Sequence, residues 1–189
     1  MNGNTALEQG VMVVTGVFSR AECNDGVRIM QSQAWSKHEF NNEASQSRYS
    51  YDDDLDVSHA TASTEGQVFA SVVMERLYGV LAKYAERWQL PWNGYSRVRF
   101  NRYAEGTCMH RHWDSIYTLF DGKVRGIPML SIVGLLNDDY EGGEFVMWDD
   151  TVIPIPKGAV LVFPSTFLYS HEVRTVTKGE RLSFVSWAW

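Results

Sequence analysis

Residues 129–164, MLSIVGLLNDDYEGGEFVMWDDTVIPIPKGAVLVFP, alternate between runs rich in Val, Ile, Leu and Phe and runs rich in Gly, Pro, Asp and Asn. Short apolar runs bounded by turn residues are typical of β-strands. The same texture extends from Tyr95 to the end of the chain, which predicts strands at 96–103, 129–136, 143–148, 151–155, 159–164, 168–173 and 181–189. About six to eight strands at this spacing predict a double-sheet jelly roll.

The first half of the chain predicts two helices. Ser19, followed three residues later by Glu22, fits a capping box and places a helix over about residues 20–33. A longer helix is predicted over residues 64–88, where apolar side chains recur at a spacing of about 3.6 residues. These apolar positions are Val68, Val72, Leu77, Leu81 and Tyr84.

Residues 37–63 are polar and show neither helical nor strand periodicity, so we expect a long loop with one short strand around Tyr49. The predicted fold class is therefore α+β, mainly β, with the N-terminal helices packed on one sheet of the jelly roll. We expect a single domain over residues 1–189, in which 1–94 provide helical support and a loop and 95–189 form the jelly-roll core.

Composition and charge indicate which partners and which cellular compartment to expect. The net charge is −6 and the 17 Lys and Arg residues are scattered, so no basic patch for nucleic acid is expected. The longest apolar runs are far shorter than the roughly 20 residues of a membrane helix. Cys23 and Cys108 lie far apart, and the N-terminus has no secretory pattern. We therefore expect a soluble cytoplasmic protein with reduced cysteines. The oligomeric state is not predicted.

The segment HRHWD, residues 110–114, carries the strongest chemical signal. In extended chain, alternate side chains point the same way, so His112 and Asp114 can converge on one metal ion. His171 lies in another strand-like run and can supply a third ligand. Two imidazoles and one carboxylate leave open coordination positions, which is the arrangement that suits Fe(II) oxygenases.

A bare His-x-Asp is weak evidence, because such pairs occur by chance in loops. His110 with His112 would also make a plausible ligand pair, although we favour His110 as a polar residue near the mouth of the site. His38 and His59 lie in polar stretches and are expected to be solvated.

Three segments carry a resemblance to a known family. NRYAEGTCMHRHWD (101–114) resembles the Tyr-x-x-Gly-x-x-Tyr-x-x-His-x-Asp motif of the prolyl 4-hydroxylase-like Fe(II)/2-oxoglutarate-dependent dioxygenases. LLNDDYEGGEF (135–145) is similar to the family's Glu-Gly-Gly-Glu segment. SHEVRTVTKGER (170–181) resembles the region that holds the distal metal histidine and, ten positions later, a basic residue. The resemblance covers about the last half of the chain.

The resemblance implies a double-stranded β-helix fold, which is the jelly roll that the strand pattern predicts. It implies Fe(II) held by His112, Asp114 and His171, with 2-oxoglutarate and O2 as co-substrates and ascorbate as a candidate reductant. It also implies that Arg181 binds the distal carboxylate of 2-oxoglutarate. Met109 stands where the family has its second Tyr, and Leu135 where some members have another Tyr.

The last strand predicts further contacts to the co-substrate. Arg181, Ser183, Val185 and Trp187 alternate and should face one side. A guanidinium offers a planar fork for a carboxylate. Ser183, in the Arg-x-Ser pattern of related oxygenases, and Tyr103 can donate to the same group, and Trp187 is a fourth candidate contact.

The expected function is hydroxylation of an unactivated C–H bond, with a peptidyl, prolyl-type residue as the favoured target and succinate and CO2 as co-products. Two alternatives stay open: the same chemistry on a small metabolite, and a cupin-like jelly roll that binds a metal or ligand without turnover. Contacts to a protein, peptide or small-molecule substrate are expected from residues 37–63 and from residues 116–128, after Asp114.

Overall fold

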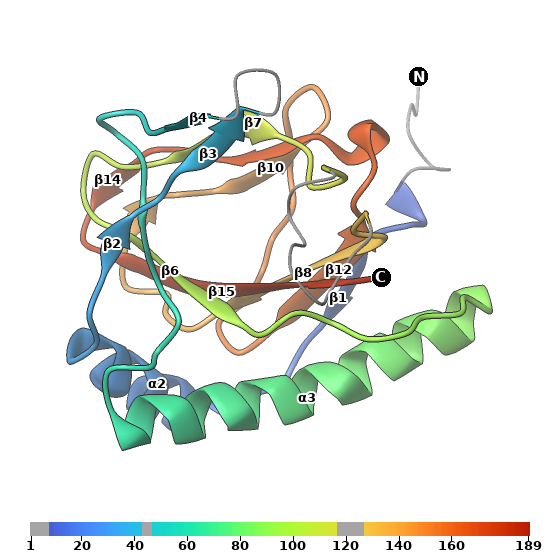
Figure 1. Ribbon diagram of the computed structural model, residues 1–189, viewed down its shortest axis with the longest axis horizontal. Helices are drawn as coiled ribbons and strands as arrows, with labels where there is room; N and C mark the ends of the chain where they lie inside the picture. Colours follow the sequence, from blue (N-terminus) through green and yellow to red (C-terminus); the bar gives the residue numbers. More distant parts are fainter. Residues whose placement is uncertain (1–7, 43–46, 117–126) are drawn as a thin grey trace.

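The computed structural model describes residues 8–42, 47–116 and 127–189. Two sheets face each other, and two helices cover the outer side of the larger sheet (Figure 1). The larger sheet has the order β1, β12, β8, β15, β6, β5, β2, with bounds Met12–Val14, Val160–Pro164, Leu130–Leu135, Arg181–Ala188, Arg99–Tyr103, Asp56–Ser58 and Ser36–Lys37. The smaller sheet has the order β11, β10, β13, β7, with bounds Thr151–Val152, Phe145–Met147, His171–Val173 and Met109–His112.

Two further pairs complete the described β-structure. The strands β9 (Glu141–Gly142) and β14 (Val176–Lys178) form one pair, and β3 (Phe40–Asn42) and β4 (Ser47–Tyr49) form the other. Each of the seven predicted segments contains an observed strand, and the described pairings in the named sheets are antiparallel. The predicted jelly roll is confirmed.

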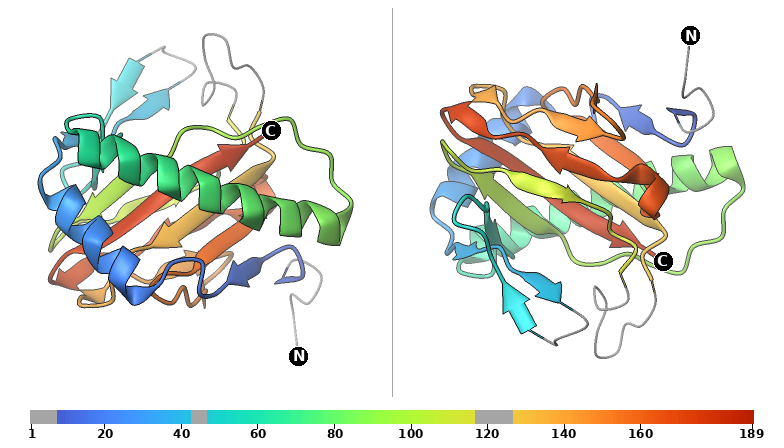
Figure 2. Two further views of the ribbon diagram at one scale, coloured as in Figure 1. Left: turned by 90° about the horizontal axis from the view of Figure 1, so that it is seen from below. Right: turned by 90° about the horizontal axis from the view of Figure 1, so that it is seen from above.

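The two predicted helices are present, as α2 (Arg20–Gln31) and α3 (Thr64–Trp88). Ser19 and Glu22 form the predicted capping box: the Ser19 hydroxyl accepts from the Glu22 amide at 3.2 Å, and Glu22 accepts from the Ser19 amide at 2.8 Å. Figure 2 shows both helices lying across one face of the larger sheet. The predicted placement of the helices on one sheet is therefore confirmed.

The predicted buried face of α3 is partly wrong. Val68 is 59% exposed and Val72 is half-buried, whereas the neighbouring Phe69 and Val73 are buried. Phe69 stacks on Phe100 of β6, with ring centroids 5.6 Å apart, so the first turns of the helix bury the positions one residue after the predicted ones. From Leu77 to Tyr84 the predicted face is the buried one.

The expectation of a long loop over residues 37–63 is also wrong, although the strand around Tyr49 is confirmed as β4. The segment contains β3 and β5 as well. Both strands are polar. The strand β3 pairs with the neighbouring β4, whereas the partner of β5 is distant in sequence: β5 adds to the edge of β6, with Val57 opposite Asn101. Leu55, just before β5, is fully buried in the core between the two sheets.

His38 is not solvated as expected; it is only 6% exposed and its ring packs against Phe40. Burial, together with the Arg99 cation, lowers the pKa of His38 from 6.5 to about 3. His59 is exposed, as expected. His38 therefore contributes to the fold as a neutral side chain.

Both cysteines, Cys23 and Cys108, are free and buried. Within the described ranges, no helix combines the length and apolar character that spanning a lipid bilayer requires.

The buried His38 predicts a specific acid sensitivity. Because folding lowers the pKa of His38 from 6.5 to about 3, its contribution to stability is complete above pH 6.5 and is lost as the pH falls toward 3. Lowering the pH from about 6.5 to about 5 should destabilise the wild-type protein by about 2 kcal/mol more than His38→Gln. Urea unfolding over this pH range measures the difference, and parallel curves for the two proteins would contradict it.

Candidate metal centre

The structure brings the three predicted metal ligands together. His171 at the start of β13 pairs directly with His112 at the end of β7, and Asp114 follows two residues later. The Asp114 carboxylate oxygens lie 3.5 Å from Nε2 of His112 and 3.7 Å from Nε2 of His171. One ligand atom from each residue lies within 4.8 Å of the others, so the three can share a single ion.

A bulge between β7 and β13 separates His110 from this group. His112 pairs with His171 and Met109 pairs with Val173, so three steps along β7 match two along β13. A bulge of this kind re-aims side chains. Met109 and His112 consequently line the inner pocket, whereas His110 lies on the outer side near Asp53. The alternative pair of His110 with His112 is not formed.

The ring orientations of both histidines suit metal binding. Nδ1 of His112 lies 2.7 Å from the carbonyl oxygen of His110, and Nδ1 of His171 lies 3.0 Å from that of Tyr169. A carbonyl can only accept, so each Nδ1 carries the proton and each Nε2 keeps its lone pair toward Asp114. These backbone contacts fix the tautomer that a metal ligand needs.

The electrostatics of the centre favour an ionised carboxylate at Asp114 and a neutral imidazole at His171. Burial alone would raise the pKa of Asp114, but the His171 and His112 rings and a 2.6 Å hydrogen bond from the Ser131 hydroxyl outweigh it and lower the pKa. Burial and the nearby His112 ring lower the pKa of His171 to about 4. At neutral pH the centre is therefore ready to accept a cation.

A pocket extends from these ligands along β15 and β6. Arg181, Ser183, Val185 and Trp187 all line it, as their alternation predicts, and Tyr103 lines it from β6. Its other lining residues are Arg99, Asn101, Met109, His112, Asp114, Ser131, Ile132, Val133, Phe145, His171 and Val173.

Arg181 is a buried cation with few partners. It is 1% exposed, and one terminal nitrogen donates to the Ser183 hydroxyl at 2.9 Å. Its guanidinium carbon lies 4.9 Å from the centroid of the Tyr103 ring. Nε is buried without a hydrogen-bond partner, and no acidic side chain among the described residues pairs with Arg181. A carboxylate ligand would supply both a hydrogen-bond acceptor and a negative charge to this guanidinium.

The two departures from the family motif leave apolar walls. Met109 is buried against the pocket, and Leu135 lies opposite Ser183 and borders a neighbouring hollow that also reaches Arg181. Ser183 and Tyr103 therefore supply hydroxyl groups beside Arg181 where these apolar side chains cannot.

Three polar pocket residues were missed from the sequence. Arg99 and Asn101 alternate with Tyr103 on β6, so the same period-two argument applied to β15 would have found them. Ser131 is the lone polar residue in the apolar run MLSIVGLL, and its hydroxyl bonds to both Asp114 and Ser165. A single polar residue in a buried strand was the available signal.

The donor set fits Fe(II). Two neutral imidazoles and one carboxylate on one face, with open positions toward a pocket, form the facial triad of non-haem Fe(II) oxygenases. A jelly roll with this triad and a buried, unpaired arginine in the same pocket defines a metal-dependent oxygenase scaffold.

Comparison with known sequences agrees with this class. Residues 98–189 match the sequence model of the 2OG-Fe(II) oxygenase superfamily. A PKHD-type hydroxylase of Stenotrophomonas maltophilia is 34% identical over 98 residues, which are 49% of this chain and 43% of that protein. Another, of Shewanella oneidensis, is 28% identical over 178 residues, 92% of this chain and 75% of that protein. The chain thus spans less than half the length of some curated relatives that it matches.

Solved structures share the fold at low identity. A Trichoplax adhaerens prolyl hydroxylase in complex with a hypoxia-inducible factor peptide superposes with a TM-score of 0.74 at 15% identity, over 95% of this chain and 83% of that one. A Pseudomonas putida prolyl-4-hydroxylase gives a TM-score of 0.62 at 18% identity, over 95% and 91%.

Over residues 98–189 the chain is similar to the 2OG-Fe(II) oxygenase superfamily, and it resembles the prolyl 4-hydroxylase-like members. Fe(II) is accordingly the metal of the family, and 2-oxoglutarate and O2 are its co-substrates.

The separation of His110 from the triad predicts different effects of two substitutions. Asp114→Ala should weaken Fe(II) binding by more than about 100-fold, because losing a group that merely orients a ligand already costs about 10–100-fold. His110→Ala should bind Fe(II) as the wild type does. Anaerobic Fe(II) titration followed by tryptophan fluorescence, to which Trp187 in the pocket contributes, measures both. Equal losses in the two variants would contradict the ligand assignment.

Proposed function

We propose that this protein is an Fe(II)- and 2-oxoglutarate-dependent dioxygenase that hydroxylates an unactivated C–H bond, with release of succinate and CO2. The favoured target is a peptidyl, prolyl-type residue. In this proposal His112, Asp114 and His171 hold the iron, and Arg181 binds the distal carboxylate of 2-oxoglutarate with help from Ser183 and Tyr103.

The metal and 2-oxoglutarate supply the oxidative chemistry when bound. The protein's residues supply position and charge. Nε2 of both histidines and the Asp114 carboxylate fix the ion, while the backbone contacts to Nδ1 keep the rings from turning. Phe145 and Phe163 pack beside the His171 ring and exclude water from that side of the centre.

The observation that carries the proposal is the unpaired Arg181 in the same pocket as the triad. A fully buried guanidinium without a counter-charge is unfavourable unless a ligand neutralises it. A simple metal-binding jelly roll has no need of such a group. Arg181 therefore supports turnover with an anionic co-substrate over the cupin-like alternative.

The first test follows succinate formed from 2-oxoglutarate under air, with Fe(II) and ascorbate. Arg181→Ala should raise the KM for 2-oxoglutarate by about 100-fold or more, because truncating one partner of a buried charge pair costs about 2–5 kcal/mol. The surface variant Arg20→Ala, whose side chain is 74% exposed, is the matched control and should behave as the wild type. An unchanged KM in Arg181→Ala contradicts the anchor.

Absence of succinate from the wild type, with iron shown to be bound and with candidate substrates supplied, would favour a binding protein without turnover.

A group of aromatic residues beside the metal centre supports a peptide substrate. Phe40 of β3 lies 6.3 Å from the His112 ring and stacks on Tyr49 of β4 at 5.6 Å between centroids. Tyr49 and Tyr51 are 43% and 46% exposed. Exposed aromatic side chains that lead to a reactive centre suit an extended peptide. These aromatic residues support the proposal that segment 37–63 contacts the substrate; residues 117–126 of the second expected segment lie outside the described structure.

Arg99 favours a second candidate, in which the substrate is a small acid. Arg99 lines the pocket, donates to Asn101 at 3.1 Å and lies over the Trp187 ring, yet no described acidic residue pairs with it. Burial lowers its pKa, so an anionic ligand would stabilise it. A free amino acid or similar carboxylate fits this group.

Two variants separate the candidates. With prolyl peptides as substrates, detected by mass as the gain of one oxygen atom, Tyr51→Ala should raise the peptide KM by about 10-fold through loss of an aromatic contact. The control is the KM for 2-oxoglutarate, which should not change. Oxidation of free carboxylates alone, lost in Arg99→Gln and insensitive to Tyr51→Ala, would reject the peptide and support the small acid.

A further inference from the structure

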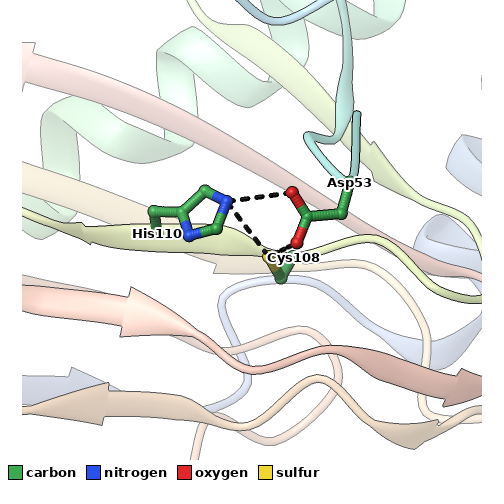
Figure 3. Close-up of side chains that lie close together, drawn as sticks. All are labelled: Asp53, Cys108 and His110. Atoms are coloured by element: carbon green, nitrogen blue, oxygen red, sulfur yellow. Dashed lines mark hydrogen bonds and ion pairs between the residues drawn. The ribbon is translucent and has the colours of Figure 1, made fainter. Parts of the chain in front are cut away.

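A second group of metal-ligating side chains lies outside the pocket. Asp53, Cys108 and His110 converge from the segment before β5 and from the start of β7 (Figure 3). Nε2 of His110 is 3.0 Å from one Asp53 carboxylate oxygen and 3.9 Å from Sγ of Cys108. Sγ of Cys108 is 3.4 Å from the other Asp53 oxygen.

The geometry does not fit a nucleophilic triad. In a Cys-His-Asp triad the cysteine and the acid contact opposite nitrogens of the imidazole. Here Asp53 and Cys108 both contact Nε2 of His110, as Figure 3 shows. The three side chains therefore point at one position between them, which is the arrangement of metal ligands and not of a proton relay.

The separations between the ligand atoms suit a tetrahedral ion. Zn–N and Zn–O distances of about 2.0–2.1 Å and a Zn–S distance of about 2.3 Å place neighbouring ligand atoms about 3.3–3.6 Å apart. His110 Nε2 lies 3.0 Å from one Asp53 oxygen, Cys108 Sγ lies 3.4 Å from the other, and Nε2 and Sγ are 3.9 Å apart. One ligand atom from each residue lies within 4.8 Å of the others. An ion could be bound with small side-chain adjustments.

The backbone holds the group in place. The Cys108 amide donates to the Asp53 carbonyl at 2.9 Å, and Asp54 forms an isolated bridge with Cys108. The Tyr51 ring packs on His110 at 4.4 Å between centroids. Such preorganisation reduces the entropy lost when a ligand binds.

The surroundings leave a fourth coordination position accessible. Cys108 is buried, whereas Asp53 and His110 are each about half exposed. The hollow that they border is also lined by Glu141, Glu144, Glu172 and Arg174. Glu172 and Glu141 pair with Arg111 and Lys178, but carboxylates still outnumber the one cation in the described lining, which favours a cationic ligand.

We propose that Asp53, Cys108 and His110 form a second metal site, distinct from the His112, Asp114 and His171 centre, that binds Zn²⁺ with water as the fourth ligand. Thiolate, imidazole and carboxylate are the ligands that Zn²⁺ takes in proteins. Because the ion would join the segment before β5 to β7, which ends at His112, it would stabilise the outer wall of the metal centre. The Cys108 thiol proton is released to solvent on binding.

Co²⁺ titration of the whole protein tests the site, because Co²⁺ bound by thiolate gives a sulfur-to-cobalt charge-transfer band in the near ultraviolet. The His112, Asp114 and His171 centre has no sulfur and cannot produce this band. The wild type should show the band, and Zn²⁺ should abolish it by competition. Cys108→Ser should lack it, and His110→Ala should need at least tenfold more Co²⁺.

Cys23→Ser is the matched control, since Cys23 is the other free buried cysteine and lies at the helix layer. It should keep the band unchanged, and circular dichroism of each variant shows whether it has folded. No band in the wild type at saturating Co²⁺ overturns the site. A band that persists in Cys108→Ser, disappears in Cys23→Ser or is unaffected in His110→Ala also overturns it.

Discussion

The pairing of His171 with His112 across β13 and β7 is the constraint on which the rest of the site depends. It sets two imidazoles from distant parts of the chain side by side, with ring centroids 4.3 Å apart. The bulge next to this pair decides that His112 faces inward and His110 outward. A shift of one residue in this register would exchange the two faces of the strand and dismantle the centre.

Much of the fold could be predicted because its signals are local. The strands of the second half are apolar runs between turn residues, and α2 begins at a capping box that the residues themselves specify. The short strand around Asp56 carries no such signal, because it is polar and depends on pairing with β6, and the polar β3 depends on pairing with β4. His38 was misjudged for the same reason: its polar neighbours in sequence are not its neighbours in space.

The site was predictable where alternation or a motif applied. Arg181, Ser183 and Trp187 follow from alternation on the last strand, and the same alternation from Tyr103 leads to Arg99. Ser131 could be recognised only as a lone polar residue in a buried apolar run. The meeting of Asp53 with Cys108 joins residues 55 positions apart through one irregular bridge, and no periodic pattern in the sequence encodes that contact.

The two arginines that line the pocket lack acidic partners in the described structure, which is the arrangement expected for groups that bind an anionic ligand. Arg181 and Arg99 are cations without acidic partners among the described residues, and the nearest carboxylate in the pocket, Asp114, is directed at the metal position. Acidic partners would stabilise the free protein, but they would have to be displaced by an anionic ligand. The unpaired arginines lower the stability of the free protein. An anionic ligand that pairs with them therefore binds more favourably and raises the stability of the folded state.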